Sequence, residues 1–198
     1  MNRRDLLKRA GAAIIPAAIL GLRLPAMDAS WQPGISRITA VVYDERYRDC
    51  RAFASVLVRR GATPFPVKGD CARLWYGALR AYLAGNRGNV AGLTTDSDFV
   101  VSRACGRELG LRLVYEGAHD SRGSNEVTHR LRSTAYQREI VADLGTDRAS
   151  WAEMLAQSLL RLPSHDSAAI FCAPVLLKTP RSSDHPGYLT SWLHEGSA

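Results

Sequence analysis

The chain has 198 residues, of which 46% are hydrophobic and 23% charged, and its formal net charge is +7 at pH 7. This composition is ordinary for a soluble globular protein, and the sequence contains no internal repeat or low-complexity tract. The basic side chains are spread along the chain without a stripe of interleaved aromatic residues, so the sequence does not indicate a nucleic-acid partner.

The first 29 residues have the plan of a signal peptide. Arg3, Arg4, Lys8 and Arg9 form a cationic start, and thirteen uncharged residues follow from Ala10 to Leu22. Spanning a bilayer takes about 20 apolar residues, and this run is shorter and is interrupted by a proline. We therefore expect no stable membrane anchor in this segment.

The segment from Asn2 to Lys8, N-R-R-D-L-L-K, resembles the signal of the twin-arginine translocation (Tat) pathway, in which two adjacent arginines precede an apolar pair and a lysine. Asn2 stands where Ser or Thr is usual, and an ordinary secretory signal or an uncleaved anchor are the alternatives. The resemblance implies export to the periplasm, with the Tat translocase as a partner. The signal residues in this resemblance are Arg3, Arg4, Leu6, Leu7 and Lys8.

Cleavage after Ala26 or Ala29 would leave a single α/β domain over residues 30–198. Five of the 26 basic and two of the 19 acidic side chains lie in residues 1–29, so the net charge of the exported domain is +4. Its four cysteines are separated by 21, 34 and 67 positions, which match no metal or haem motif. They could form disulfides in an oxidising periplasm or serve as small buried hydrophobic residues.

From Ile38 onward, apolar β-rich runs alternate with amphipathic segments. Strands are expected at Ile38–Tyr43, Thr63–Lys68, Val90–Thr94 and Leu111–Tyr115. Helices are expected from about Tyr47 to Arg60, from Gly69-Asp70 to Ala84, and from Thr95-Asp96-Ser97 to Leu109. Asp70 has the place of an N-cap, and the prolines in the second strand favour an edge of the sheet.

Alternating strands and helices predict an α/β fold with a mostly parallel sheet of βα units. Placing the second strand at an edge gives the flavodoxin-like order 2-1-3-4. The second half of the chain, after Tyr115, is expected to form an α+β extension. There, 119–126 is expected to be a loop, 130–144 a helix or, in its later part over 139–144, a strand, and 168–177 a strand followed by a turn. A capping-box pattern predicts a helix over Ser150–Leu162, and Tyr188–Leu193 is expected to form a terminal strand that packs Trp192.

In open parallel sheets, ligands bind beyond the carboxyl ends of the strands. The expected layout places a rim of polar residues there, and helix capping is the alternative explanation for several of them. This candidate ligand-binding rim consists of Asp44, Asp70, Thr94, Thr95, Asp96, His119 and Asp120.

Two other sets of residues have fewer of the features that a catalytic site requires. His119 with Asp120 and a distant serine could form a hydrolase triad, but no G-x-S-x-G motif supplies the nucleophile, so the catalytic residues stay unknown. Cys71 lies near an expected helix N-terminus, where the dipole can favour a thiolate, although a structural role is the simpler interpretation. The sequence contains no recognisable cofactor motif and no metal-ligand motif.

Three functional hypotheses follow. Small Tat-borne chains resemble accessory or maturation subunits that accompany a larger redox enzyme across the membrane, which would make an oxidoreductase subunit the partner. The second hypothesis is a periplasmic small-ligand binding domain that uses Asp44, Thr94 and Asp96. The third is a small periplasmic hydrolase that uses His119.

Overall fold

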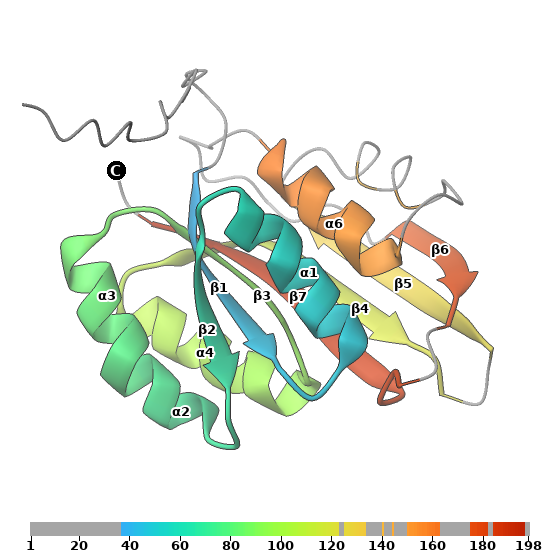
Figure 1. Cartoon of the computed structure of the whole chain (residues 1–198), viewed down its shortest axis with the longest axis horizontal. Coiled ribbons are helices and arrows are strands. Elements are labelled where there is room, and N and C mark those ends of the chain that lie inside the picture. Colours follow the sequence, from blue (N-terminus) through green and yellow to red (C-terminus); the bar gives the residue numbers. More distant parts are fainter. Residues whose placement is uncertain are drawn as a thin grey trace, which may run out of the picture. The chain divides into compact units, whose positions relative to one another are not determined.

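A computed structural model describes residues 37–122, 125–133, 140, 144, 150–162, 175–181 and 184–196. Its centre is a seven-stranded sheet with the order β2-β1-β3-β7-β4-β5-β6 (Figure 1). The strands are β1 (Ile38–Asp44), β2 (Thr63–Val67), β3 (Asn89–Thr94), β4 (Arg112–Asp120), β5 (Glu126–Ser133), β6 (Val175–Pro180) and β7 (Tyr188–Glu195). The described residues therefore have an α/β fold.

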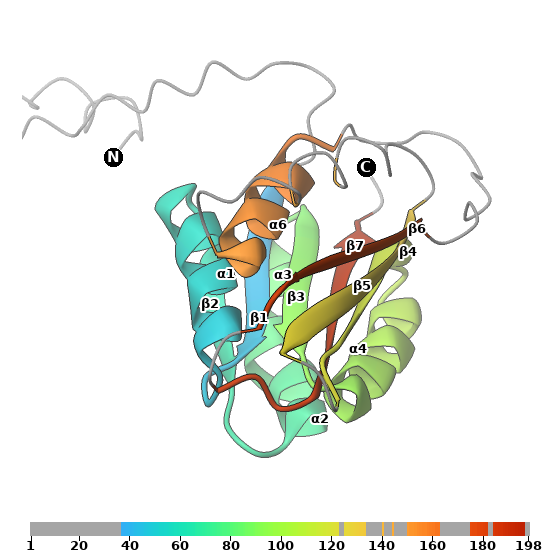
Figure 2. The ribbon, with the colours of Figure 1, turned by 90° about the vertical axis from the view of Figure 1, so that its right-hand side faces the viewer.

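Helices cover the two faces of the sheet (Figure 2). On one face α1 (Arg48–Arg59) and α6 (Trp151–Leu160) pack on each other and on the strands, in a core that contains Phe53, Leu57 and Leu155. The second face carries α2 (Cys71–Leu74), η1 (Trp75–Leu79), α3 (Arg80–Gly85) and α4 (Asp96–Glu108), packed around Trp75 and Trp192. Within the described residues, no helix is both long and apolar enough to cross a membrane.

The expected order 2-1-3-4 and the mostly parallel sheet are wrong, because β7 lies between β3 and β4. The β1 strand pairs in parallel with β2 and with β3, as expected, and β2 is at the edge. β7 is antiparallel to both β3 and β4, so the sheet is mixed. Every residue of β7 after Tyr188 is buried, which suits a strand covered on both faces.

Gly92 makes this insertion possible. It lies opposite Trp192 in the β3–β7 pair, and a Cβ atom at this position would collide with the indole ring. The missing side chain leaves room for Trp192, which is fully buried and accounts for much of the core on this face. The prediction that the terminal strand packs Trp192 is confirmed.

The first two helices are largely as expected. α1 buries Cys50, Phe53 and Leu57, but Val58 is 40% exposed and does not belong to its inner face. Asp70 is the N-cap of α2 and accepts a hydrogen bond from the backbone N–H of Arg73 at 3.0 Å. The single helix expected up to Ala84 consists of α2, η1 and α3, with non-helical torsion angles at Gly77.

The apolar spacing of α4 predicts an inner face of Val101, Ala104, Cys105 and Leu109, and the structure confirms it in part. Cys105 is buried, Val101 and Leu109 are partly buried against the same core, and Ala104 is exposed, whereas Phe99, Ser102 and Gly106 are buried as well. Ser102 Oγ accepts a buried hydrogen bond from Trp75 Nε1 at 2.9 Å, so a polar residue takes part in the core contact. Apolar periodicity identified this face only in part, because the face also includes a serine and a glycine.

The second half forms an antiparallel sheet extension. The expected loop over 119–126 is wrong at both ends, because His119 and Asp120 close β4 and Glu126 opens β5. Within 130–144, residues 130–133 are strand, Ile140 and Leu144 are helical and buried, and the others lie outside the described residues. α6 is confirmed, although Ser150 makes no side-chain cap hydrogen bond. Of the strand expected over 168–177, residues 168–174 lie outside the described residues.

Candidate functional site

The expected rim at the carboxyl ends of the strands is divided into local pairs. Asp44 is fully buried and accepts hydrogen bonds from Arg46 Nε at 2.9 Å and from its terminal nitrogen at 2.6 Å. Asp120 forms the same kind of fork with Arg122, whose hydrogen bond lowers the pKa of Asp120 to about 2. Both carboxylates are thus engaged by an arginine two residues further along.

Two other rim residues are helix caps. Asp70 caps α2, as described above, and Thr95 Oγ1 accepts a hydrogen bond from the backbone N–H of Asp98 at 3.4 Å at the start of α4. The capping explanation therefore fits both side chains.

The beginning of β7 engages the remaining residues at the end of β3. Thr190 Oγ1 donates to Asp96 Oδ1 at 3.3 Å, and Trp192 Nε1 donates to Thr94 Oγ1 at 3.4 Å. β7 therefore lies between the end of β3 and the end of β4. The polar groups from these two strands do not form the continuous rim that an adjacent pair would have given.

His119 belongs to a buried hydrogen-bond chain beneath α6. Its Nε2 lies 2.7 Å from Ser191 Oγ, and its Nδ1 lies 2.6 Å from Nδ1 of His129. The chain continues from His129 Nε2 to Thr179 Oγ1 at 2.7 Å and from Ser191 Oγ to the Tyr115 hydroxyl at 3.0 Å. Four strands, β4, β5, β6 and β7, contribute to this chain.

The indole of Trp151 covers both imidazoles, with ring centroids 4.5 Å from His119 and 4.9 Å from His129. Burial lowers the pKa of His119 well below its usual value and that of His129 to about 3, so both rings are neutral at pH 7. The Ser191–His119 pair has the hydrogen bond that a nucleophile and its base require. Both residues are fully buried, however, so a substrate does not reach the pair in this conformation.

The cysteines in the described part of the chain are buried free thiols: Cys50, Cys71 and Cys105. Burial raises the pKa of Cys71 to about 11, which outweighs any effect of the nearby helix N-terminus and argues against a thiolate. Cys172 lies outside the described residues. Among these residues, no group of three His, Cys, Asp or Glu side chains could hold a metal ion.

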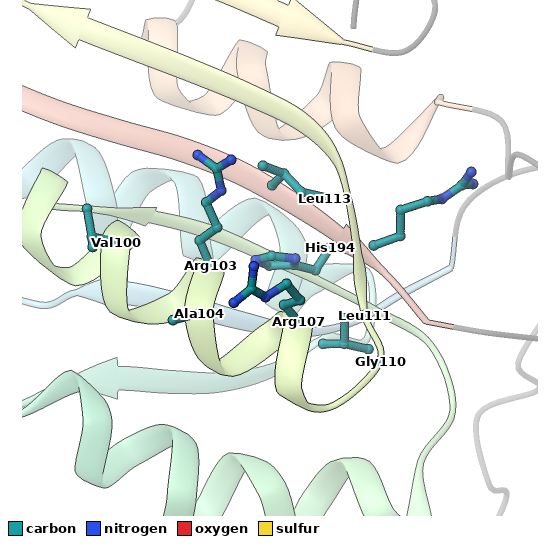
Figure 3. Close-up of a pocket in the computed structure, with 9 residues that line it drawn as sticks. Val100, Arg103, Ala104, Arg107, Gly110, Leu111, Leu113 and His194 are labelled. Carbon is teal, nitrogen blue, oxygen red and sulfur yellow. The ribbon is translucent and has the colours of Figure 1, made fainter. Parts of the chain in front are cut away.

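An open pocket lies between α4, the start of β4 and the end of β7 (Figure 3). It is at the other end of the β4 strand from the expected rim. We call it the arginine pocket, and its volume is about 690 Å³. It is lined by Val100, Arg103, Ala104, Arg107, Gly110, Leu111, Arg112, Leu113 and His194. It thus combines three cationic side chains with an apolar wall.

Arg103 and Arg107 are four residues apart on α4 and therefore lie on the same side of the helix. Figure 3 shows both side chains on the side of α4 that faces the strands. Among the described residues, neither has an ion-pair partner, whereas Arg112 pairs with Glu195. Two positive charges in the pocket are therefore left without a neutralising carboxylate in this part of the chain.

His194 lies in the wall of the pocket with neither ring nitrogen hydrogen-bonded, although its side chain is almost completely buried. Gly106 admits the ring, because a Cβ atom there would come within 2.9 Å of His194 Cε1. Burial, followed by the charge of Arg103, lowers the pKa of His194 to about 4. The neutral ring always carries one N–H, so at least one buried donor has no partner.

The arrangement can accept an anion. Guanidinium groups bind carboxylate and phosphate through charge-assisted hydrogen bonds, and the unpaired His194 donor adds a polar group within the apolar wall. The sequence did not predict this site, because ligands are expected at the carboxyl ends of the strands and the arginine pocket lies at their other end. The signal that could have indicated it is the i, i+4 arginine pair at Arg103 and Arg107, followed by Arg112.

No protein-family model, no curated protein and no solved structure matches this chain.

Proposed function

We propose that this protein is an exported domain that binds a small anionic ligand in the arginine pocket. The observation that carries the proposal is the combination of two unpaired arginines, Arg103 and Arg107, with the unpartnered buried ring of His194. An unpaired buried polar group costs roughly 1–3 kcal/mol, and a ligand that hydrogen-bonds to it would recover part of this cost. The proposal keeps the hypothesis of a small-ligand binding domain but moves its site away from the rim.

The lining of the pocket also indicates how the ligand would be oriented. Leu111 and Leu113 are half-buried, and Val100 is 61% exposed, so the wall offers apolar surface beside the guanidinium groups. A ligand with an anionic head and an apolar body would place the head on Arg103 and Arg107 and the body against these side chains. Burial of apolar surface is worth about 25 cal/mol per Å², which would supplement the exposed charge contacts.

The test measures the binding of acetate, hexanoate, phosphate and sulfate to residues 30–198. Calorimetry gives the affinity of each anion, and thermal denaturation gives the change in melting temperature. We expect hexanoate to raise the melting temperature in a saturable manner. Arg103→Gln with Arg107→Gln should weaken its binding at least about fivefold, which corresponds to about 1 kcal/mol from two exposed charge contacts.

Arg73→Gln is the matched control, because Arg73 is also an exposed arginine on a helix of the same face but does not line the pocket. It should leave the affinity unchanged. If no anion shifts the melting temperature, or if the Arg103/Arg107 variant binds as tightly as the control, the pocket is not the binding site.

Export is part of the proposal and is supported by the resemblance of Asn2 to Lys8 to a Tat signal, a segment outside the described residues. A role as an accessory subunit of a periplasmic oxidoreductase also stays a prediction. Native purification tests it, since recovery of a monomer without a larger redox subunit would contradict it. The hydrolase hypothesis has gained the Ser191–His119 pair, and an inert protein across ester and amide substrates would remove it.

A further inference from the structure

A second hollow adjoins the arginine pocket at the same edge of the sheet. Its volume is about 300 Å³, and Leu111 lines both. The second hollow is lined by Arg80, Leu83, Ala84, Asn86, Arg87, Gly88, Leu109, Leu111 and Gly196. α3 contributes its first residue, Arg80, and the turn between α3 and β3 contributes Arg87. The two hollows therefore meet at the leucine that precedes β4.

Both hollows are cationic. Arg80 and Arg87 are exposed and, within the described part of the chain, have no ion-pair partner, as is also true of Arg103 and Arg107. No Asp or Glu is among the described residues that line either hollow. With Arg112, the joint surface carries five arginines, so an anionic group is favoured at each of its ends.

The part between the two arginine groups is apolar. Leu111 lies at the junction, Leu113 continues on the side of the arginine pocket, and Leu83 and Leu109 continue on the side of the second hollow. All four leucines are only partly buried, so apolar surface is available for contact. The pattern along the surface is cationic, apolar and cationic again.

Two glycines, Gly88 and Gly196, line the second hollow where two backbone segments approach each other. A Cβ atom on Gly196 would come within 2.8 Å of the Gly88 carbonyl oxygen, and one on Gly88 would collide with Thr39. These backbone segments approach each other closely because neither residue has a side chain.

We propose that the two hollows form one binding surface for a linear amphipathic dianion, a molecule with an anionic group at each end and an aliphatic chain between them. This inference rests on the proposed function, because one end of the ligand occupies the arginine pocket. One anionic group contacts Arg103 and Arg107, the chain crosses Leu111, and the second group contacts Arg80 and Arg87. An α,ω-alkanedicarboxylate has this chemistry.

The distribution of charge along the ligand distinguishes amphipathic dianions from other polyanions on this surface. A polyphosphate carries charge along its whole length and would place anionic groups over the leucines, where the cation of this part, Arg112, is already paired with Glu195. A single-stranded nucleic acid would use aromatic side chains for base stacking, and no Phe, Tyr or Trp is among the described residues that line the two hollows. The apolar junction therefore favours an aliphatic middle.

The experiment compares ligands on the same exported domain by calorimetry. The probes are hexanedioate, decanedioate and tetradecanedioate, together with decanoate as the monoanion of matched length and tripolyphosphate as the fully charged chain. We expect one of the two longer dicarboxylates to bind at least about tenfold more tightly than decanoate, because only a long dianion reaches both arginine groups.

Two double variants separate the ends of the surface. Arg80→Gln with Arg87→Gln should reduce the affinity for the best dicarboxylate to that of decanoate and leave decanoate binding unchanged. Arg103→Gln with Arg107→Gln should weaken both ligands. All four positions are exposed, so each variant is first checked for an unchanged melting temperature, with Arg73→Gln as the control.

The outcomes distinguish this inference from the proposed function. If decanoate and the dicarboxylates bind equally, and the Arg80/Arg87 variant has no effect, the inference is overturned while binding in the arginine pocket stands. If none of the anions binds, phosphate and sulfate included, the inference and the proposed function both fail. If tripolyphosphate binds more tightly than every dicarboxylate, the ligand does not need an aliphatic chain between its charged ends, and this inference is overturned.

Discussion

Lowering the pH from 7 to 5 should strongly destabilise the folded protein. His119, His129, His185 and His194 are at most 3% exposed, and burial is the largest cause of the low pKa of each ring. In the unfolded chain, each histidine has a pKa of about 6.5 and binds a proton as the pH falls. The unfolded state therefore takes up more protons than the folded state in this range, so stability decreases with falling pH.

The magnitude follows from the difference in proton binding. At pH 5, protonation favours the unfolded state by roughly 2 kcal/mol per histidine that stays neutral in the fold, relative to pH 7. His129 has a folded pKa of about 3, His185 and His194 have folded pKa values of about 4, and His119 is shifted in the same direction, so all four stay largely neutral at pH 5. The total loss is roughly 8 kcal/mol, comparable to the whole stability of many domains.

Urea denaturation of residues 30–198 at constant ionic strength, at half-unit steps between pH 5 and pH 7, measures this loss. His194→Gln should make the pH dependence of the unfolding free energy shallower by about a quarter, since it removes one of the four titrating histidines. The affected range ends as the pH approaches the folded pKa values, where the folded state also binds protons. A total loss below about 2 kcal/mol over the two pH units would refute the assignment of neutral buried histidines.

Three further predictions concern the core and the signal. Gly92→Ala places a Cβ atom against the Trp192 ring and should destabilise the fold by at least about 2 kcal/mol, seen as a lower melting temperature, whereas an unchanged temperature would contradict the tight β3–β7 contact. Ser102→Ala removes the acceptor of the Trp75 indole and should cost about 1–3 kcal/mol in urea denaturation, with a neutral result arguing against that hydrogen bond. Arg3→Lys with Arg4→Lys should leave the fold intact and retain the protein in the cytoplasm, as measured by cell fractionation, and normal export would exclude the Tat assignment.

Local patterns predicted much of the first half. The positions of β1, α1, β2, β3 and α4 agree with the sequence to within a few residues, because each element carries its own periodicity and its own start or stop residue. Asp70 and Thr95 behave as the caps that their positions indicate. The prolines of β2 correctly indicated an edge, since proline cannot donate a ladder hydrogen bond.

The candidate site depended on contacts that no local pattern contains. His119 and Ser191 are 72 positions apart, yet their side chains share a hydrogen bond. The arginine pocket likewise joins α4 with His194, more than eighty positions further along the chain. Apolar periodicity left Gly106 out of the inner face of α4, because this glycine faces inward only where the His194 ring packs against it.

The sequence by itself determined the alternation of strands and helices, their caps and the edge position of β2, because these properties depend on neighbouring residues. Tertiary structure decided where the last strand pairs. β7 enters the centre of the sheet because it can bury side chains on both faces and because Gly92 leaves space for Trp192. That pairing separates β3 from β4, divides the expected rim, and brings His194 to the arginines of α4.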